Sequence, residues 1–504
     1  MRLATVYSRA QLGIEAPQVT VEVDLSNGLP GISIVGLPET AVKESKDRVP
    51  AALLNAQFHF PDRRITVSLA PADLPKEGGR FDLPIALGIL AASGQLNDEK
   101  LGGYEFLGEL SLGGALRPIR GVLPAALQAR ASNRCLVVPE ENGPEAALVR
   151  NSRVLTAMSL LEVTAHLENG KSLPVPVAEK TSSSIFYPDL NAVYGQHQAR
   201  RALELAAAGT HNMLMCGPPG CGKTLLASCL PGVLPPMTDS EALETAIVAS
   251  LSGRKIDLSR WWQRRFRSPH HTVSSIALAG GGSRPKPGEI SLAHNGVLFL
   301  DELPEFDRRA LEVLREPMES GQIIISRVAR SARFPANFQL IAAMNPCPCG
   351  YFGDESGRCR CPAGRINNYL SRISGPLLDR IDIHIKMPRT SIKKLIGHTT
   401  APECSEAVRC RIIAARQKQM DRGGVTNARL EHDQLKIYCD LDADCRKLLA
   451  AADEKMQLSV RAHNGILKVA RTIADLDDCE KIQIAHLGEA LALRPGSIDV
   501  QPRY

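Results

Sequence analysis

One run of residues organises this 504-residue chain: Gly217-Pro218-Pro219-Gly220-Cys221-Gly222-Lys223-Thr224. It fits the pattern G-x-x-x-x-G-K-[ST], with an apolar stretch before it (213–215) that predicts a buried strand and a helical start after it (225–227). The glycines let successive backbone N–H groups turn toward phosphates, Lys223 reaches the β/γ oxygens, and the Thr224 hydroxyl binds Mg²⁺. The alternative is a Gly/Pro turn before a helix, but both flanks favour a site for ATP and Mg²⁺.

A second motif is the run GVLFLDE at residues 296–302. Its apolar part is too short for a typical helix and ends in two carboxylates, which is typical of a buried parallel strand. Asp301 is suited to hold the Mg²⁺ and its water shell, and Glu302 to orient an attacking water. Two acids alone would be an ordinary strand end, whereas both motifs in one chain predict nucleotide hydrolysis.

Length and composition place the chain among globular proteins. Its 504 residues predict two to four domains, and 44% hydrophobic residues are ample for packed cores. No apolar run reaches the roughly 20 residues of a spanning helix, the longest lying near 83–96, and residues 1–13 lack a signal-peptide core. We therefore expect a cytoplasmic protein with no membrane partner. Thirteen cysteines, an odd number, favour reduced thiols, and a net charge of +6 permits a polyanionic partner.

The chain divides by pattern into successive segments. Residues 1–170 alternate strands (19–25, 32–35, 65–69) with helices (40–56, 83–93) and predict an α/β domain. Residues 171–187, rich in Pro, Ser and Thr, predict a linker. An ATPase core follows at 188–391, and a helical segment, the predicted lid, at 392–504. One apolar stripe of the lid comprises Ile466, Val469, Ala470, Ile473 and Leu476.

The first domain resembles the protease domain of Lon, a ribosomal-S5-type fold shared with RadA-type recombination proteins. The resemblance rests on PKEGGR at 75–80 and LGGALRPI at 112–119. Lon uses a serine nucleophile with a lysine base. Because Arg80 stands at the position of the serine and Leu123 at that of the lysine, we expect a non-proteolytic scaffold.

Two stretches between the motifs have open interpretations. Arginines and Lys255 gather around Trp261-Trp262 (Arg254, Arg260, Arg264, Arg265 and Arg267), which suits nucleic-acid contact or, equally, a solvated basic face. The run Gly280-Gly281-Gly282-Ser283 predicts a mobile loop.

After Glu302, Asp307 is expected to cap one helix that carries Leu311, Leu314 and Met318 and ends at Gly321.

Two apolar stretches at 323–325 and 333–338 predict a hairpin with a basic tip formed by Arg327, Arg330 and Arg333. In the Mg-chelatase and MCM branch of AAA+ proteins, which the chain resembles, the corresponding hairpin points into the pore of a ring. The resemblance therefore implies that these arginines contact DNA. The alternative is a surface hairpin with solvated arginines.

The apolar strand predicted at 339–344 ends at Asn345. An amide at that edge suits positioning of the lytic water, the AAA+ sensor 1 role, and the alternative is a strand-terminating Asn beside Pro346.

Two C-x-C pairs follow, formed by Cys347, Cys349, Cys359 and Cys361. Four thiolates from two tight turns can close a Zn²⁺ site, while free cysteines or a redox pair are the alternatives.

Two further arginines are implied by the resemblance. Arg380, in LLDRID, resembles the arginine finger that reaches the nucleotide of the neighbouring subunit, although Arg372 is another candidate and an ion pair with Asp382 another role. Arg461, in SVRA, resembles the start of sensor 2 and is expected on the bound phosphates. Complementing a helix end is a weak alternative for Arg461, since its charge would lie at the N-terminus.

These motifs together resemble the YifB/ComM family of Mg-chelatase-like AAA+ proteins over nearly the whole chain. The implied fold is an α/β AAA+ P-loop core with a helical lid, preceded by a Lon-protease-like α/β domain. The implied function is that of a homo-hexameric ATPase motor, or helicase, which drives branch migration of DNA in homologous recombination during natural transformation. Recombination proteins are then further partners. The rival is a chelatase-like or chaperone ATPase that remodels a protein partner.

Overall fold

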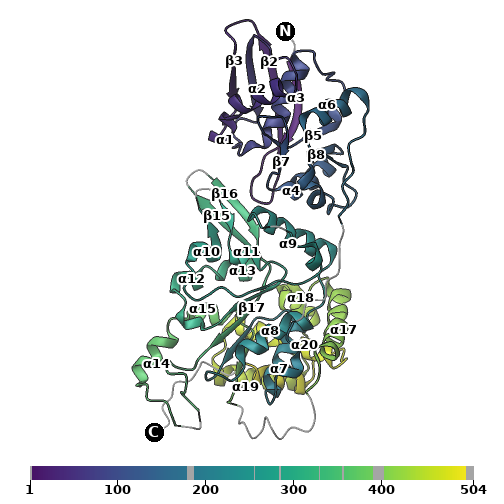
Figure 1. The fold of residues 1–504 in the computed structure, drawn as a ribbon. Helices are drawn as coiled ribbons and strands as arrows, with labels where there is room; N and C mark the ends of the chain where they lie inside the picture. Colours follow the sequence, from purple (N-terminus) through teal and green to yellow (C-terminus); the bar gives the residue numbers. More distant parts are fainter. Residues whose placement is uncertain are drawn as a thin grey trace. The chain divides into compact units, whose positions relative to one another are not determined.

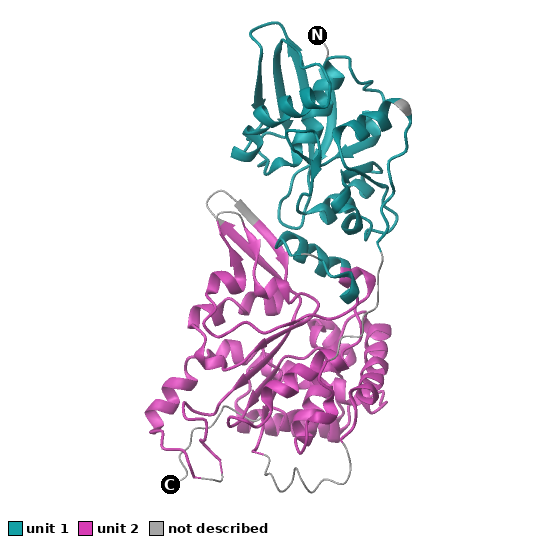
Figure 2. Cartoon of the chain, viewed as in Figure 1, with its two compact units in different colours: residues 1–182, 243–261 teal, residues 183–242, 262–504 magenta. Residues whose placement is uncertain are grey.

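A computed structural model describes residues 3–178, 187–254, 256–282, 285–327, 330–354, 357–389 and 402–494. The chain divides into two compact units (Figure 2). One comprises Met1–Ser182 with Leu243–Trp261, and the other Ser183–Ala242 with Trp262–Tyr504. The first division falls inside the segment predicted as a linker, of which residues 179–186 lie outside the described part.

The first unit is built on a four-stranded sheet in the order β1-β2-β4-β3 (Figure 1). Its strands are β1 (Leu3–Arg9), β2 (Gln18–Ser26), β3 (Gly31–Val35) and β4 (Arg64–Ala70). β2 pairs antiparallel with β1 and β4, while β3 joins β4 in parallel. Every second residue of β2 is buried, which confirms the strand predicted from alternating hydrophobicity.

Helix α3 (Asp82–Ala92) packs on β1 and β2, and all of its residues are buried. It contains most of the longest apolar run of the sequence. That run is therefore apolar because it lies at the centre of the core of the first unit. No helix within the described ranges is long and apolar enough to cross a membrane. Helices α1 (Thr40–Lys43) and α2 (Ser45–Asn55) form where one helix was predicted.

The rest of the first unit adds a parallel sheet in the order β5-β8-β9 and a short hairpin. The strands are β5 (Tyr104–Phe106), β6 (Glu109–Leu110), β7 (Leu116–Arg117), β8 (Cys135–Pro139) and β9 (Val154–Ala157), with helices α4 (Val122–Ala131), α5 (Gly143–Ala146) and α6 (Leu160–Asn169). Helix α9 (Asp239–Leu251) contributes its larger part to this unit. There Ser250 Oγ donates to Glu145 Oε1 at 2.5 Å, so a segment distant in sequence completes the unit.

The second unit contains a five-stranded parallel sheet in the order β11-β14-β17-β10-β18. The strands are β10 (Met213–Cys216), β11 (Phe266–Arg267), β14 (Val297–Leu300), β17 (Gln339–Met344) and β18 (Ile383–Lys386). β14 and β17 are completely buried, as near-continuous apolar runs require in a parallel sheet. Every second residue of β10, β14, β17 and β18 packs with the helices in one core cluster.

Helices α7 (His197–Gly209) and α8 (Lys223–Val233) pack on each other, and the C-terminal helices pack on them (Figure 1). The C-terminal helices are α17 (Ser405–Gly423), α18 (His432–Tyr438), α19 (Ala443–Met456), α20 (Val460–Leu476) and α21 (Ile484–Ala492). The predicted stripe of α20 is buried from Ile466 to Ile473. This confirms an α/β core with a helical C-terminal part, while Pro495 lies outside the described residues.

A buried polar network joins the core to α20. His211 is fully buried, with Nδ1 3.0 Å from Asp382 Oδ2 and Nε2 2.8 Å from Thr472 Oγ1. The Thr472 hydroxyl also receives a hydrogen bond from Asn427 Nδ2 at 3.0 Å, and Asn427 bonds Asp475 at 2.8 Å. Buried polar groups of this kind fix one arrangement of the elements they join.

Smaller elements lie between the sheet strands: α10 (Ser275–Ala279), β12 (Gly280–Gly281), β13 (Lys286–Pro287), α11 (Glu289–Leu292), α12 (Arg308–Glu312), α13 (Arg315–Ser320), β15 (Gln322–Arg327), β16 (Arg330–Pro335), α14 (Ala363–Leu370) and α15 (Gly375–Leu378). The mobile loop predicted at the glycine run is wrong for its described part, because β12 pairs with β13. A Cβ on Gly280 would lie 2.3 Å from the Lys286 carbonyl oxygen. Close pairing therefore requires glycine there.

The helix predicted after Asp307 is capped as expected, since the Asp307 side chain accepts from Arg309 N at 2.7 Å. It is two helices, however, α12 and α13. Pro317 has no N–H to bond the carbonyl of Val313, which accounts for the break. Gly321 ends α13 at φ +68°.

The predicted hairpin is present as β15 and β16, which pair antiparallel. Arg327 pairs with Arg330 at its end, whereas Arg333 pairs with Ile324 within the strands. The prediction that Arg333 belongs to the tip is therefore wrong, although its side chain is exposed. The side chains of Arg327 and Arg330 lie outside the described part of the chain.

Candidate nucleotide-binding site

The loop at residues 217–222 connects β10 to α8, as the sequence predicts. Gly220 and Gly222 have φ of +77° and +93°, which favours glycine at both positions. A Cβ on Gly217 would lie 2.5 Å from the Met387 carbonyl oxygen, so this position has no room for a side chain. The backbone N–H groups at the start of α8 lie at a helix N-terminus, which is suited to bind an anion.

Lys223 is folded back into this loop. Its Nζ donates to the carbonyl oxygens of Gly217 (2.7 Å) and Pro218 (3.0 Å) and to Asn345 Oδ1 (3.1 Å). The ammonium group therefore lies inside the loop, in the place from which a P-loop lysine reaches phosphate oxygens.

The next residue meets the acid of β14. Thr224 Oγ1 donates to Asp301 Oδ2 at 2.8 Å. A hydroxyl and a carboxylate oxygen in contact are the hard oxygen ligands that Mg²⁺ prefers. The residues at this position therefore fit a magnesium ion bound together with a nucleotide.

Strand β17 lies between β14 and β10, and this order explains the position of Asn345. All three strands are parallel, so their carboxyl ends meet at one edge, where Asp301, Asn345 and the phosphate loop follow. The Lys223–Asn345 bond shows that the amide lies beside the loop. Sequence analysis placed Asn345 at this edge without a contact to the lysine.

Glu302 has φ +54° and ψ +46°, an uncommon left-handed conformation for a residue other than glycine. Its N–H donates to Asp301 Oδ1 at 2.9 Å, and Oε2 lies 3.3 Å from His271 Nδ1. Sequence analysis missed His271, which precedes α10 in a stretch without a motif. The carboxylate is half exposed, so water can reach it.

The four cysteines converge after Asn345. Their sulfur atoms lie within 4.8 Å of one another, with separations of 3.3 Å for Cys347–Cys349, 3.7 Å for Cys347–Cys359 and 3.6 Å for Cys349–Cys359. Tetrahedral zinc with Zn–S bonds of about 2.3 Å would separate its sulfurs by roughly 3.8 Å. All four, Cys361 included, are free thiols, so the donor set fits one zinc ion.

This cysteine cluster contacts the phosphate loop. Gly350 has φ +84°, and a Cβ on it would lie 2.6 Å from Pro219 Cδ. Against the effect of burial, hydrogen bonds from the Tyr351 amide and the neighbouring thiols lower the pKa of Cys349 to about 6, whereas burial and the contacts with Cys349 and Cys347 raise the pKa of Cys359. A thiolate is the form that binds a metal.

Arg380 and Arg461 converge on one carboxylate, that of Glu319 in α13. Arg380 Nη2 lies 2.9 Å from Glu319 Oε1, and Arg461 forms an ion pair with the same oxygen. Asp382 instead contacts His211, so the alternative pairing of Arg380 with Asp382 is not observed. Sequence analysis missed Glu319.

Arg372, the second finger candidate, donates to the Pro304 carbonyl oxygen and to Glu305 Oε2, both at 3.1 Å. Its side chain is half exposed, whereas that of Arg380 is nearly buried. The two candidates therefore differ in how freely they could reach a partner.

The arginines near Trp261 are largely paired. Arg264 bonds Glu241, Arg267 bonds Glu289 through two contacts of 2.7 Å, and Arg260 lies 3.2 Å from Asp257. Trp261 is buried, and Lys255 lies outside the described residues. Arg264 and Arg267 are also largely shielded from solvent, so these contacts do not favour a nucleic-acid platform.

Arg80 and Leu123, which the sequence analysis assigned to the positions of a Lon-type serine and lysine, are both buried. Arg80 donates to Gln11 Oε1 (2.6 Å) and to the Arg120 carbonyl oxygen (2.8 Å), and burial lowers its pKa to about 10. Leu123 is fully buried.

A parallel sheet that gathers the loop lysine, a hydroxyl–carboxylate pair and an amide at one edge, with helices after it, defines a P-loop nucleotide-binding protein of the AAA+ type. Three sequence families match this chain: magnesium chelatase subunit ChlI at residues 189–395, subunit ChlI of Mg-chelatase at 21–142, and the ChlI C-terminal family at 402–494.

Individual relatives extend over nearly the whole chain. Competence protein ComM of Haemophilus influenzae is 51% identical over 98% of both chains, and a protein named YifB of Salmonella typhimurium is 49% identical over 98% of this chain and 97% of its own. The 38 kDa magnesium-chelatase subunit of Cereibacter sphaeroides is 24% identical over 59% of this chain and 87% of its own. The chain belongs to the YifB/ComM family of Mg-chelatase-like AAA+ proteins.

Proposed function

We propose that this chain is a Mg²⁺-dependent ATPase that assembles as a homo-hexameric ring and drives branch migration of DNA during natural transformation. The single observation that carries the hydrolytic part is the contact of Thr224 Oγ1 with Asp301 Oδ2. It joins two separate motifs at the one edge where Lys223 and Asn345 also meet.

Each residue at this edge has a role in the proposal. Thr224 and Asp301 would hold Mg²⁺, which supplies charge neutralisation when bound. Lys223 would exchange its bonds to the loop carbonyls of Gly217 and Pro218 for the β/γ oxygens of ATP. Glu302 would orient the attacking water and accept its proton, and Asn345 would hold that water in line.

A ring requires residues that act between subunits. Arg380 is proposed as the finger, because its guanidinium is already ordered by Glu319 and shares that acid with Arg461. Arginine is suited to this role, since it stays charged and its planar donors match phosphate oxygens. Arg461, at the start of α20, is proposed to contact the bound phosphates in the sensor 2 role.

The β15–β16 hairpin directly precedes β17, which ends beside Asn345. A change at the nucleotide thus has a short path along one strand to the hairpin. Arg327, Arg330 and Arg333 are proposed to contact DNA phosphates, and the exposure of Arg333 supports its access to them.

Zinc at the four cysteines is proposed as a structural ion. The cluster begins two residues after Asn345 and packs its Gly350 against Pro219, so a closed Cys₄ shell would fix both sides of the nucleotide edge. The first unit is proposed as a non-proteolytic scaffold, because Arg80 and Leu123 offer neither a nucleophile nor a base.

Replacing Arg327, Arg330 and Arg333 together with alanine tests the proposed function. Basal ATP turnover and ring assembly should stay, while DNA stimulation and branch migration fall together and the salt dependence of DNA binding becomes shallower, by about 0.9 in log–log slope per lost contact. The matched control removes three charges from α19: Arg446, Lys447 and Lys455.

Branch migration at the wild-type rate by the hairpin variant would make the hairpin a bystander. A rate of ATP turnover that DNA does not change and a protein partner does change would favour the rival function, remodelling of a protein partner. The similarity to a magnesium-chelatase subunit is the observation behind that rival.

A further inference from the structure

A cavity of about 190 Å³ lies at the amino ends of the sheet strands, in the second unit. Its lining includes Gly296 before β14, Gln339 at the start of β17, and Thr210 before β10, while Arg416 and Thr426 come from α17 and the turn after it. The phosphate loop follows the carboxyl ends of the same strands. The cavity is therefore on the opposite edge of the sheet from the nucleotide site.

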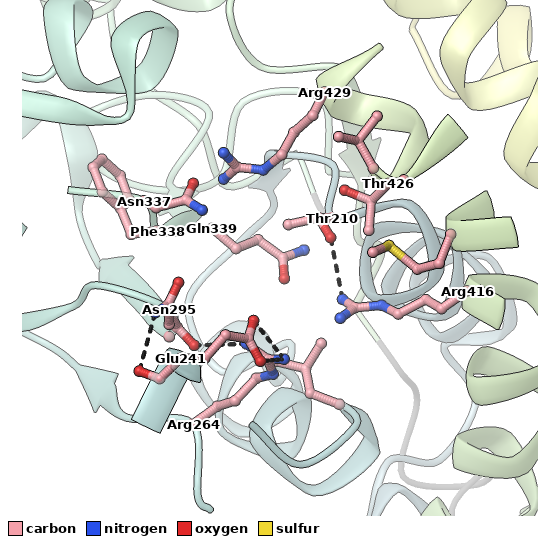
Figure 3. A pocket seen from close by; sticks show the side chains of 15 residues that line it. Thr210, Glu241, Arg264, Asn295, Asn337, Phe338, Gln339, Arg416, Thr426 and Arg429 are labelled. Carbon is pink, nitrogen blue, oxygen red and sulfur yellow. Dashed lines mark hydrogen bonds and ion pairs between the residues drawn. The ribbon is translucent and has the colours of Figure 1, made fainter. Parts of the chain in front are cut away.

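Three arginines line this cavity, and Glu241 is the one acid among the lining residues (Figure 3). Arg264 forms an ion pair with that acid through contacts of 3.0 and 3.1 Å from its two terminal nitrogens. Figure 3 shows this pair on one side of the cavity and the guanidinium groups of Arg416 and Arg429 on the others. The charge of Glu241 also acts on Arg416 and Arg429, but neither forms an ion pair with it in the described part of the chain.

Arg416 donates twice to the Ala207 carbonyl oxygen, at 2.9 and 2.6 Å, and once to Thr210 Oγ1 at 3.2 Å. Within the described ranges it forms no ion pair. Burial, followed by the positive charge of Arg264, lowers its pKa to about 9. A bound anion would offset both effects, because an opposite charge favours the charged form.

Arg429 has no side-chain hydrogen bond or ion pair in the described part of the chain, and its guanidinium points into the cavity (Figure 3). The hydroxyl oxygen of Thr426 is buried, again without a partner among described residues. A buried hydroxyl without a hydrogen bond destabilises the folded state, so the Thr426 hydroxyl needs an explanation. This hydroxyl lines the same cavity as Arg429, an exposed residue whose side chain has no ion pair among the described residues.

We propose that this cavity is a second anion site, distinct from the P-loop, which takes a phosphate group. Arg416 and Arg429 supply planar donors that match phosphate oxygens, and the hydroxyls of Thr210 and Thr426 complete the donor set. The volume is many times the roughly 10–15 Å³ that one water requires, which leaves room for a phosphate and part of its ester. Since the lining comes from both the sheet and α17, a bound phosphate would link the core to the C-terminal helices.

The test titrates inorganic phosphate into the full chain by calorimetry at constant ionic strength, with chloride as the balancing anion. All proteins carry Lys223→Ala, which weakens the P-loop as a competing phosphate site. Saturable binding should occur, weaken at least tenfold in Arg429→Gln, and weaken severalfold in Thr426→Val. Arg446→Gln, which removes an exposed arginine of α19, should bind like the parent.

Neither test variant should fail to fold, because Arg429 and Thr426 have no side-chain partner to lose among the described residues. The melting temperature without phosphate is therefore expected to stay unchanged. Absence of saturable binding in the parent would overturn the proposal, and so would equal affinity in Arg429→Gln. Competition with a DNA duplex identifies the source: displacement assigns the site to a phosphodiester backbone, and persistence assigns it to a small phosphate compound.

Discussion

We expect Glu302→Gln to separate catalysis from folding in this protein. The change keeps the shape of the side chain and removes its negative charge. Glu302 is 49% exposed, and its one ion-pair contact in the described structure is the 3.3 Å approach to His271. An exposed pair of this kind contributes at most about 1 kcal/mol, so the free energy of unfolding should hardly change.

Turnover should respond very differently. Loss of a positioned general base lowers kcat by about 10²- to 10⁴-fold, or roughly 2.7–5.5 kcal/mol in the activation barrier. Lys223, Thr224 and Asp301 are intact in the variant, so ATP affinity should stay within about threefold of wild type. Hydrolysis, nucleotide binding and thermal unfolding are measured on the same preparation.

Glu312→Gln is the matched control. Glu312 is 34% exposed and pairs with Arg315 at 2.6 Å, so it loses a similar surface ion pair on α12. Its turnover should equal that of wild type. Turnover of Glu302→Gln within twofold of wild type would refute the assignment of the water-orienting carboxylate.

Three further predictions concern the metal, the ring and the lid. The purified protein should contain one zinc per chain, lost in Cys359→Ser; a folded, reduced and metal-free wild type would contradict the Cys₄ site. Arg380→Ala should assemble yet hydrolyse ATP poorly, and mixing it with Lys223→Ala should restore activity, since some interfaces then combine an intact loop with an intact finger; no rescue in confirmed mixed rings would count against action between subunits. Thr472→Val should lower the free energy of unfolding by about 1–3 kcal/mol in urea, because His211 Nε2 loses its buried partner at 2.8 Å; a loss under about 0.5 kcal/mol would show that the network does not hold the lid.

The nucleotide edge was predictable because its chemistry is local. The phosphate loop needs its glycines, lysine and hydroxyl within one short run, and each remaining polar group follows an apolar strand directly. Asp301 and Asn345 could therefore be assigned to strand ends from the sequence. The arrangement of those strands, with β17 between β14 and β10, brings Asn345 to Lys223, and no local pattern encodes that contact.

Other features depend on contacts between distant residues. The unpaired positive charge near Trp261 was overestimated. Glu241 pairs with Arg264 and Glu289 with Arg267, and each acid lies more than twenty residues from its arginine, so a charge count over a short stretch of sequence omits it. Glu319 was missed for the same reason, since an exposed acid on a helix has no motif. Apolar spacing predicted the β15–β16 hairpin but not its register, so Arg333 was assigned to the wrong place.

The most direct test of the central claim measures ATP turnover with and without branched DNA across a salt series. If DNA phosphates engage the ring and drive its cycle, DNA should stimulate turnover severalfold at low salt. The DNA concentration needed for half-maximal stimulation should then rise linearly with salt on logarithmic axes. Turnover that is identical with and without DNA at every salt concentration, in protein shown to form rings and hydrolyse ATP, would contradict the account.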